Sequence, residues 1–269
     1  MSILGFASAN TTLFVGGSGD GNYSSIQDAL NNAFKGDVIY VYAGTYYENI
    51  IVNISVLLMG EDKETTIING GGHKNVVLLQ SDNCMVSGFT IINSGMTFPL
   101  AGITVNSNDN TIIGNNIYQN YYGIRLELTS GNLISDNHIW NNFQCGVYFS
   151  RASNNILSFN IVKNHSFNGF GLYEFSDKNL IIGNVFRNNS FSGVNIRDSY
   201  DNSLEDNQFI ENTVGLHSPT ADYKTDINSN LFTSNAIDVE IEVNPHMTFG
   251  SGYAVFLIVA FFIIKKFEL

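Results

Sequence analysis

The sequence predicts an all-β protein, a right-handed parallel β-helix built as a three-sheet solenoid, with a short N-terminal capping helix and a C-terminal transmembrane helix. The main observation is a motif, Asn-x-φ-x-x-Asn with φ apolar, whose copies start 22 to 24 residues apart. Abundant Asn and 25 Gly against 3 Pro indicate tight polar turns between short strands. An uncharged C-terminal stretch is the third observation. The motif starts at Asn115, Asn137, Asn160, Asn184, Asn207 and Asn230.

Each repeat is expected to contain three short strands. A second copy of the motif precedes each start by five residues, and a strand that begins with Gly follows each pair; these strands begin at Gly123, Gly146, Gly169, Gly193 and Gly215. Such strands cannot bury an apolar face alone, but repeats stacked about 4.8 Å apart form three parallel sheets around one core. The motif predicts that core for residues 37–243.

The repeated asparagines are interpreted as scaffold rather than as a ligand surface. Asn tolerates left-handed backbone conformations, bonds to its own backbone and stacks with the Asn of the next repeat in a hydrogen-bonded ladder. In one repeat His165 takes the place of the closing Asn. We expect it to fill the same corner.

Residues 10–36 are predicted to form an N-terminal strand and the capping helix. Ser25 and Asp28 have the spacing of a capping box, and Ile26, Leu30 and Ala33 supply an apolar face. Such a helix would cover the open end of the solenoid, where core and strand edge are otherwise exposed. Strands of the first coils are expected at residues 38–42, 50–53, 56–59 and 66–69.

Both ends of the chain resemble export signals. Ala7-Ser8-Ala9 matches a signal-peptidase site, so residues 1–9 are interpreted as the remnant of a signal peptide. Residues 244–269 are predicted to be a linker and membrane anchor, because residues 247–264 are uncharged and two lysines follow them. A buried C-terminal strand is the alternative. An anchor here would leave the body at the cell surface or on the periplasmic side of the membrane.

The segment SSIQDALNNAFKGDVIYVYAGTYYENIIVNISVLLMGEDKETTIINGGG, residues 24–72, resembles the opening of NosD-like proteins of the pectin-lyase-like superfamily. The Asn repeats, up to about residue 241, are similar to the carbohydrate-binding and sugar-hydrolase repeats of that family. The resemblance implies a right-handed parallel β-helix. It does not fix an activity, because the same scaffold serves lyases, esterases, hydrolases and binding proteins.

Candidate functional residues come from the outward positions of the Gly-led strands. One column contains Thr104, Arg125, Tyr148, Gly171, Asn195 and His217; the next contains Asn106, Glu127, Ser150, Tyr173, Arg197 and Pro219; a third contains Leu128, Arg151, Glu174 and Asp198. Tyr148, Tyr173, His217 and Arg125 could stack on or bond to a sugar, or could simply stabilise the stacked strands. These residues, with Glu127, Arg151 and Arg197, form the predicted ligand-binding set.

Glu174 and Asp198 are the catalytic candidates, since two carboxylates one coil apart could cleave a glycoside or hold Ca²⁺. The alternative is an ion-pair ladder with Arg151 and Arg197, which would keep both carboxylates ionised and oppose general acid catalysis. The polygalacturonase-like motifs N-T-D, D-D, G-H-G and R-I-K do not occur. We therefore predict a surface protein that binds without catalysis, with a polysaccharide lyase or glycoside hydrolase as the alternative.

Charge and ligand chemistry restrict the partners. The net charge of −12 weighs against nucleic acid, which needs clustered Lys and Arg. Carbohydrate or a cell-envelope component, and the membrane through residues 247–264, are the expected partners. No resident cofactor is expected. The resemblance also implies a copper-handling accessory role, but the His, Met and Cys residues that copper prefers are scattered along the sequence.

Overall fold

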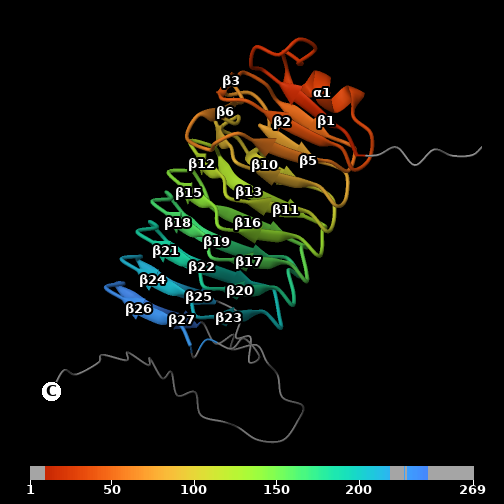
Figure 1. Ribbon diagram of the computed structural model, residues 1–269. Helices are drawn as coiled ribbons and strands as arrows, with labels where there is room; N and C mark the ends of the chain where they lie inside the picture. The colour runs from red at the N-terminus through yellow and green to blue at the C-terminus, as the bar shows by residue number, and fades with distance from the viewer. Residues whose placement is uncertain (1–9, 219–226, 228, 242–269) are drawn as a thin grey trace, which may run out of the picture.

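The computed structural model describes residues 10–218, 227 and 229–241, and they form a right-handed solenoid of three parallel sheets (Figure 1). Each coil contributes one strand to each sheet, so consecutive strands of a sheet lie about one repeat apart in sequence. The prediction of a three-sheet parallel β-helix is confirmed.

We call the three sheets A, B and C, with nine strands in each. Sheet A contains β1 Thr12–Val15, β2 Val38–Val41, β5 Leu57–Gly60, β8 Met85–Ser87, β11 Thr111–Ile113, β14 Leu133–Ser135, β17 Ile156–Ser158, β20 Leu180–Ile182 and β23 Ser203–Glu205. Sheet B contains β3 Gly44–Tyr46, β6 Thr66–Asn69, β9 Thr90–Ile92, β12 Asn116–Tyr118, β15 His138–Trp140, β18 Ile161–Lys163, β21 Val185–Arg187, β24 Gln208–Ile210 and β26 Leu231–Thr233. Sheet C contains β4 Ile50–Val52, β7 Val77–Leu79, β10 Ala101–Val105, β13 Tyr122–Glu127, β16 Val147–Ser150, β19 Asn168–Tyr173, β22 Ser192–Arg197, β25 Val214–Ser218 and β27 Ile237–Ile241.

The core is made by the apolar members of the repeat. On sheet B they are aligned one above the other in the strand register and are fully buried; from β12 to β24 they are Ile117, Ile139, Val162, Phe186 and Phe209. The rings of Phe186 and Phe209 stack with their centroids 5.4 Å apart, and Phe232 continues the stack 4.7 Å further. The repeat therefore specifies the core.

Three asparagine ladders lie at the corners of the solenoid. In the ladder between sheets A and B, from Asn137 onward, each Oδ1 accepts from the backbone N–H and the side-chain amide of the Asn one coil earlier, as Asn160 does for Asn137 at 2.9 and 3.0 Å. One part of the prediction is wrong. The left-handed residue at a corner is the one before the ladder Asn, for example Asp136 at φ 54°, Phe159 at 54° and Gly183 at 67°. That residue turns the chain, so the following Asn side chain points inward.

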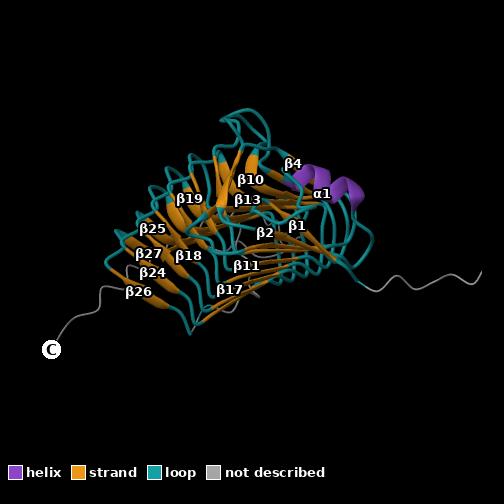
Figure 2. Cartoon of the chain, turned by 45° about the horizontal axis from the view of Figure 1, so that its top comes forward, coloured by secondary structure: helices purple, strands orange, loops and turns teal. Residues whose placement is uncertain are grey.

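Helix α1, Ile26–Asn32, covers the N-terminal end of the solenoid (Figure 2), as predicted. Ser25 Oγ accepts from the N–H of Asp28 at 3.1 Å, and the Glu48 carboxylate accepts from the N–H groups of Ile26 and Gln27. The Gln27 amide also bonds to both backbone groups of Ile51, at 2.8 and 3.3 Å. Because Ile51 lies on β4, the edge strand of sheet C, this side chain takes the place of a neighbouring strand.

The remnant of a signal peptide predicted at residues 1–9 and the anchor predicted at residues 247–264 lie outside the described residues. In the part of the chain that is described, no helix has the length and apolar character needed to cross a bilayer.

Candidate functional site

The outer face of sheet C carries the predicted columns of side chains. The strand register pairs Thr104 with Arg125, and continues through Tyr148, Gly171 and Asn195 to His217. The second column runs from Glu127 through Ser150 and Tyr173 to Arg197. Pro219 lies outside the described residues. The sequence thus predicts correctly which of these residues become neighbours.

Three tyrosines form a ladder across this face. The ring centroids of Tyr122 and Tyr148 are 4.8 Å apart and those of Tyr148 and Tyr173 are 5.1 Å apart, and both pairs are stacked. Gly171 makes this possible, because a side chain there would collide with the Tyr173 ring. The Tyr173 hydroxyl accepts from Asn168 Nδ2 at 2.8 Å, which fixes the ring across the face of the sheet. We call these three residues the tyrosine ladder.

Tyr122 was not predicted. Strict alternation from the outward Arg125 would place it in the core, but a side chain at Gly123 would meet the buried Ile139, so the Gly position faces inward instead. Tyr122 packs with Ala101 and the free thiol of Cys145 in a small cluster outside the main core. A break in the alternation at the Gly position therefore moves an aromatic ring to the outer face, and the sequence pattern carries no separate signal for it.

Burial makes the side chains of the ladder unsuited to acid–base catalysis. It raises the pKa of the Tyr122, Tyr148 and Tyr173 phenols above that of a free tyrosine, and raises the pKa of the Cys145 thiol to about 12. All four groups therefore stay protonated near neutral pH. The ladder offers aromatic surface rather than a base or a nucleophile.

The predicted charged residues form a chain of ion pairs beside the ladder. Arg125 pairs with Glu127, and Arg151 pairs with Glu127 at 3.3 Å and with Glu174 at 3.4 Å. Ser150 Oγ also donates to Glu174, at 3.1 Å. The carboxylate of Glu174 thus has an Arg and a hydroxyl as partners.

Asp198 is also paired, with Arg197 at 3.6 Å between Nε and Oδ2. The residues of the third column, Leu128, Arg151, Glu174 and Asp198, share left-handed backbone conformations with φ between 51° and 55°. They are the corner between sheets C and A, which holds the side chains at the rim of the face. The geometry favours the ion-pair interpretation of Glu174 and Asp198 over a pair poised for acid–base cleavage.

Several polar atoms of the first column are buried without a partner among the described residues. They are Thr104 Oγ1, Arg125 Nε and Asn195 Oδ1. The Arg125 side chain is only 6% exposed, and the ring of Phe98 lies 5.9 Å from its Cζ. Buried polar atoms usually bond to protein, water or ligand, so these three mark places where a polar ligand or an ordered water could bind.

His217, at the far end of this column, is held by Glu240. Its Nδ1 lies 2.8 Å from Glu240 Oε2, and the ring meets the edge of Phe191 at 5.3 Å. Glu240 was not predicted, although it follows His217 by one repeat and pairs with it in the strand register. The spacing of the repeat alone would have predicted Glu240 as the neighbour of His217.

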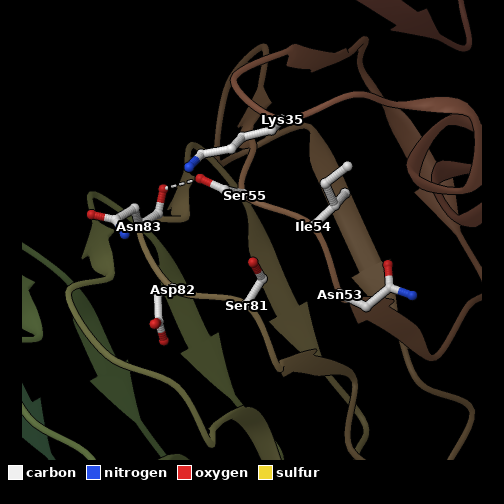
Figure 3. Close-up of a pocket in the computed structure, with 7 residues that line it drawn as sticks. All are labelled: Lys35, Asn53, Ile54, Ser55, Ser81, Asp82 and Asn83. Carbon is white, nitrogen blue, oxygen red and sulfur yellow. Dashed lines mark hydrogen bonds between the residues drawn. The ribbon is translucent and has the colours of Figure 1, made fainter.

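A shallow polar hollow of about 330 Å³ lies near the N-terminal end (Figure 3). Its lining is Lys35, Asn53, Ile54, Ser55, Ser81, Asp82 and Asn83. Ser55 Oγ donates to the Asn83 carbonyl at 3.0 Å across it. No residue of this lining is aromatic or belongs to the predicted columns, so the hollow and the tyrosine ladder are separate features.

Potential metal ligands are dispersed. Across the described ranges, no three His, Cys, Asp or Glu residues converge on one point. Cys84 and Cys145 are free, buried and in different coils. Both ring nitrogens of His165 are used inside a ladder, where Nδ1 accepts from the Asn142 N–H and Nε2 contacts the Ile139 carbonyl, each at 3.2 Å.

Comparison with known proteins gives a family and a fold. The model of a family described as periplasmic copper-binding protein (NosD) matches residues 30–253. A probable pectinesterase/pectinesterase inhibitor 6 from Arabidopsis thaliana is 37% identical over 103 residues, which cover 34% of this chain. The match spans only 18% of the length of that protein.

Two solved structures illustrate the structural likeness. The A-module of a mannuronan C-5 epimerase from Azotobacter vinelandii is 14% identical with a TM-score of 0.58, covering 80% of this chain and 73% of the module. An alginate lyase from Paenibacillus sp. is 16% identical with a TM-score of 0.47, covering 87% of this chain and 99% of the lyase. At this identity the likeness to the epimerase module concerns the fold alone.

Proposed function

Because the chain belongs to the NosD family, we propose that it is an extracytoplasmic β-helix protein that binds carbohydrate or another envelope component on sheet C without catalysis. The family is described as periplasmic, which supports a location outside the cytoplasm. Tethering to the membrane through residues 247–264 is part of the proposal and rests on their uncharged sequence.

The tyrosine ladder is the observation that carries the binding proposal. Stacked rings suit the C–H surface of a pyranose, and the partly exposed groups of Glu127 and Arg151 beside them can bond to sugar hydroxyls. The names of the pectinesterase and of the mannuronan epimerase refer to enzymes of polysaccharides. A polysaccharide-type ligand is consistent with those similarities.

The absence of catalysis is proposed from the pairing of the carboxylates. Glu174 and Asp198 each have an Arg within 3.6 Å, so each carboxylate is engaged in an ion pair. One observation favours the alternative, a polysaccharide lyase or hydrolase. Glu240 holds Nδ1 of His217, and an imidazole oriented in this way is a common arrangement for a general base.

Copper, which the family description names, does not fit the described side chains. A copper site needs converging soft or imidazole ligands, and here Cys84, Cys145 and His165 are each buried in a separate structural role. Calcium needs several converging oxygens, and Glu174 and Asp198 are paired with arginines instead.

A screen of the purified protein on a glycan panel, followed by calorimetric titration of the best ligand, tests the proposal. We expect Tyr148→Ala to weaken that binding at least tenfold, which corresponds to about 1.4 kcal/mol. The reason is that Tyr148 contacts both other rings of the ladder. Tyr47→Ala is the matched control, because Tyr47 is 76% exposed and should leave binding unchanged.

The same preparation decides between binding and cleavage. We expect no release of sugar fragments by the wild-type protein, and none by a Glu174→Gln, Asp198→Asn double variant. Cleavage by the wild-type protein that disappears in the double variant would contradict a non-catalytic role. Cleavage that disappears only in His217→Gln would favour the imidazole as the base.

A further inference from the structure

A second group of aromatic and charged side chains lies on the outer face of sheet B, whose strands form a different side of the solenoid from sheet C (Figure 1). Tyr118 and Trp140 are partners in the strand register, and their rings stack with centroids 4.4 Å apart. The ring of His138 lies 4.2 Å from that of Trp140. We call these three residues, with Lys63 and Lys163, the Trp140 cluster.

Two lysines place positive charge beside the rings. Lys163 is the register partner of Trp140 in the next coil. Lys63 belongs to the turn between β5 and β6, and both lysines act on the imidazole of His138, whose pKa is lowered mainly by burial and further by these two charges. Within the described residues neither lysine has an ion-pair partner, since the ion pairs found there use Arg or His.

The turn that carries Lys63 is fixed against the sheet. Thr90 Oγ1 donates to the Lys63 carbonyl at 2.6 Å, and Glu64 Oε1 accepts from Asn116 Nδ2 at 3.0 Å. The N–H of Glu64 bonds in turn to the side chain of Asp62 at 2.8 Å. Of the two carboxylates in this turn, Glu64 accepts from an amide and Asp62 accepts from a backbone N–H, and the backbone that bears the Lys63 ammonium is held in place.

One polar atom of the cluster is unsatisfied. His138 Nε2 is buried and has no hydrogen-bond partner among the described residues. Buried polar atoms are rarely left without a partner in folded proteins, so an ordered water or a ligand group is expected beside it. This observation does not depend on the ring contacts or on the lysines.

We propose that the Trp140 cluster binds an anionic saccharide independently of the face on sheet C. The indole and phenol rings suit the apolar C–H surface of a sugar, and two ammonium groups suit its carboxylate. A simple anion would not use the rings, and a neutral sugar would not use the lysines. In a chain with a net charge of −12, a pair of lysines without acidic partners is a specific arrangement for such a ligand.

Intrinsic fluorescence tests this site directly, because Trp140 is the only Trp of the chain. The full-length protein is titrated with an oligogalacturonate of about six residues, with a neutral malto-oligosaccharide of the same length, and with sodium phosphate. We expect saturable quenching by the oligogalacturonate, at least tenfold weaker binding of the neutral oligomer, and no saturable response to phosphate. Added salt should weaken the binding of the oligogalacturonate, because part of that binding is ionic.

Variants separate this site from the one on sheet C. Lys163→Gln and Lys63→Gln should each raise the Kd for oligogalacturonate at least fivefold, while Tyr148→Ala should leave the Trp140 titration unchanged. Thermal unfolding of each variant confirms that it folds. The proposal is overturned by an absence of quenching, by an equal response to the neutral oligomer or to phosphate, or by lysine variants that titrate as the wild type does. None of these results bears on ligand binding at the tyrosine ladder.

Discussion

Replacing His165 with Asn is expected to remove the loss of stability that protonation of this residue should cause in the wild-type protein between pH 6.5 and about 4. His165 is fully buried in the ladder between sheets B and C, and burial lowers its pKa to about 4. Its Nδ1 accepts from the Asn142 N–H as an Asn oxygen would, and Nε2 contacts the Ile139 carbonyl as an Asn amide would. A proton on Nδ1 would meet the Asn142 N–H, so the folded state requires the neutral ring.

The direction of this effect follows from which state binds the proton. In the unfolded chain His165 takes up a proton below about pH 6.5, whereas the folded state takes it up only near pH 4. The contribution of His165 is therefore complete above pH 6.5 and is lost as the pH falls toward 4. The difference between the pKa of His165 in the unfolded and in the folded state corresponds to a loss of about 3 kcal/mol in the free energy of unfolding.

Urea unfolding of both proteins at pH 7.5, 6, 5 and 4.5 measures this loss of unfolding free energy. The difference in unfolding free energy between His165→Asn and the wild type should grow in favour of the variant as the pH falls. His73→Asn is the control, since His73 is exposed and replacing it should leave the wild-type pH dependence. If the unfolding free energies of His165→Asn and of the wild type fell in parallel with pH, the ladder would tolerate a protonated ring.

Asn184→Ala is expected to destabilise the protein strongly, because this ladder side chain makes five hydrogen bonds. The Asn184 Oδ1 accepts from both nitrogens of Asn160, at 2.9 and 3.0 Å, and its Nδ2 donates to the carbonyls of Leu157 and Ile182 and to Asn207 Oδ1. Alanine would leave a buried backbone N–H without its acceptor and withdraw a donor from the next Asn. At about 1–3 kcal/mol for each buried group left unsatisfied, we expect a loss of about 3–5 kcal/mol.

The free energy of unfolding by urea, monitored by circular dichroism at neutral pH, checks this value. Asn53→Ala is the matched control, because Asn53 is exposed at the edge of the polar hollow, and we expect it to change the free energy by less than about 0.5 kcal/mol (Figure 3). A loss below about 1 kcal/mol for Asn184→Ala would mean that the ladder contributes little to stability. The repeated asparagines would then need another explanation.

The fold could be predicted because its cause repeats in the sequence. Each coil supplies the same apolar and Asn positions, so the register of Ile117, Ile139 and Val162 could be predicted from spacing alone. The left-handed backbone of the residue before each ladder Asn could not be predicted in this way. Positions such as Asp136, Phe159 and Gly183 share a left-handed backbone but no single residue type, and the Gly, Asp and Asn residues common among them do not stand out in so Asn-rich a sequence.

The candidate site was predicted only in part, because function depends on departures from the repeat. Spacing placed Arg125, Tyr148 and Tyr173 on one face, but could not show that the lack of a side chain at Gly171 lets the Tyr173 ring lie across the sheet. Nor could it show that Tyr122 joins the ladder, since that depends on a local break in the alternation. The contacts that suggest a ligand are therefore the ones that the periodic pattern does not contain.

The central claim, that the tyrosine ladder on sheet C is the carbohydrate-binding face, is tested most directly by a crystal structure of the protein with the tightest ligand of the glycan panel. We predict sugar rings stacked against Tyr148 and Tyr173, with hydroxyls bonded to Glu127 or Arg151. A ligand bound elsewhere, with the ladder unchanged and without sugar contacts, would contradict the account.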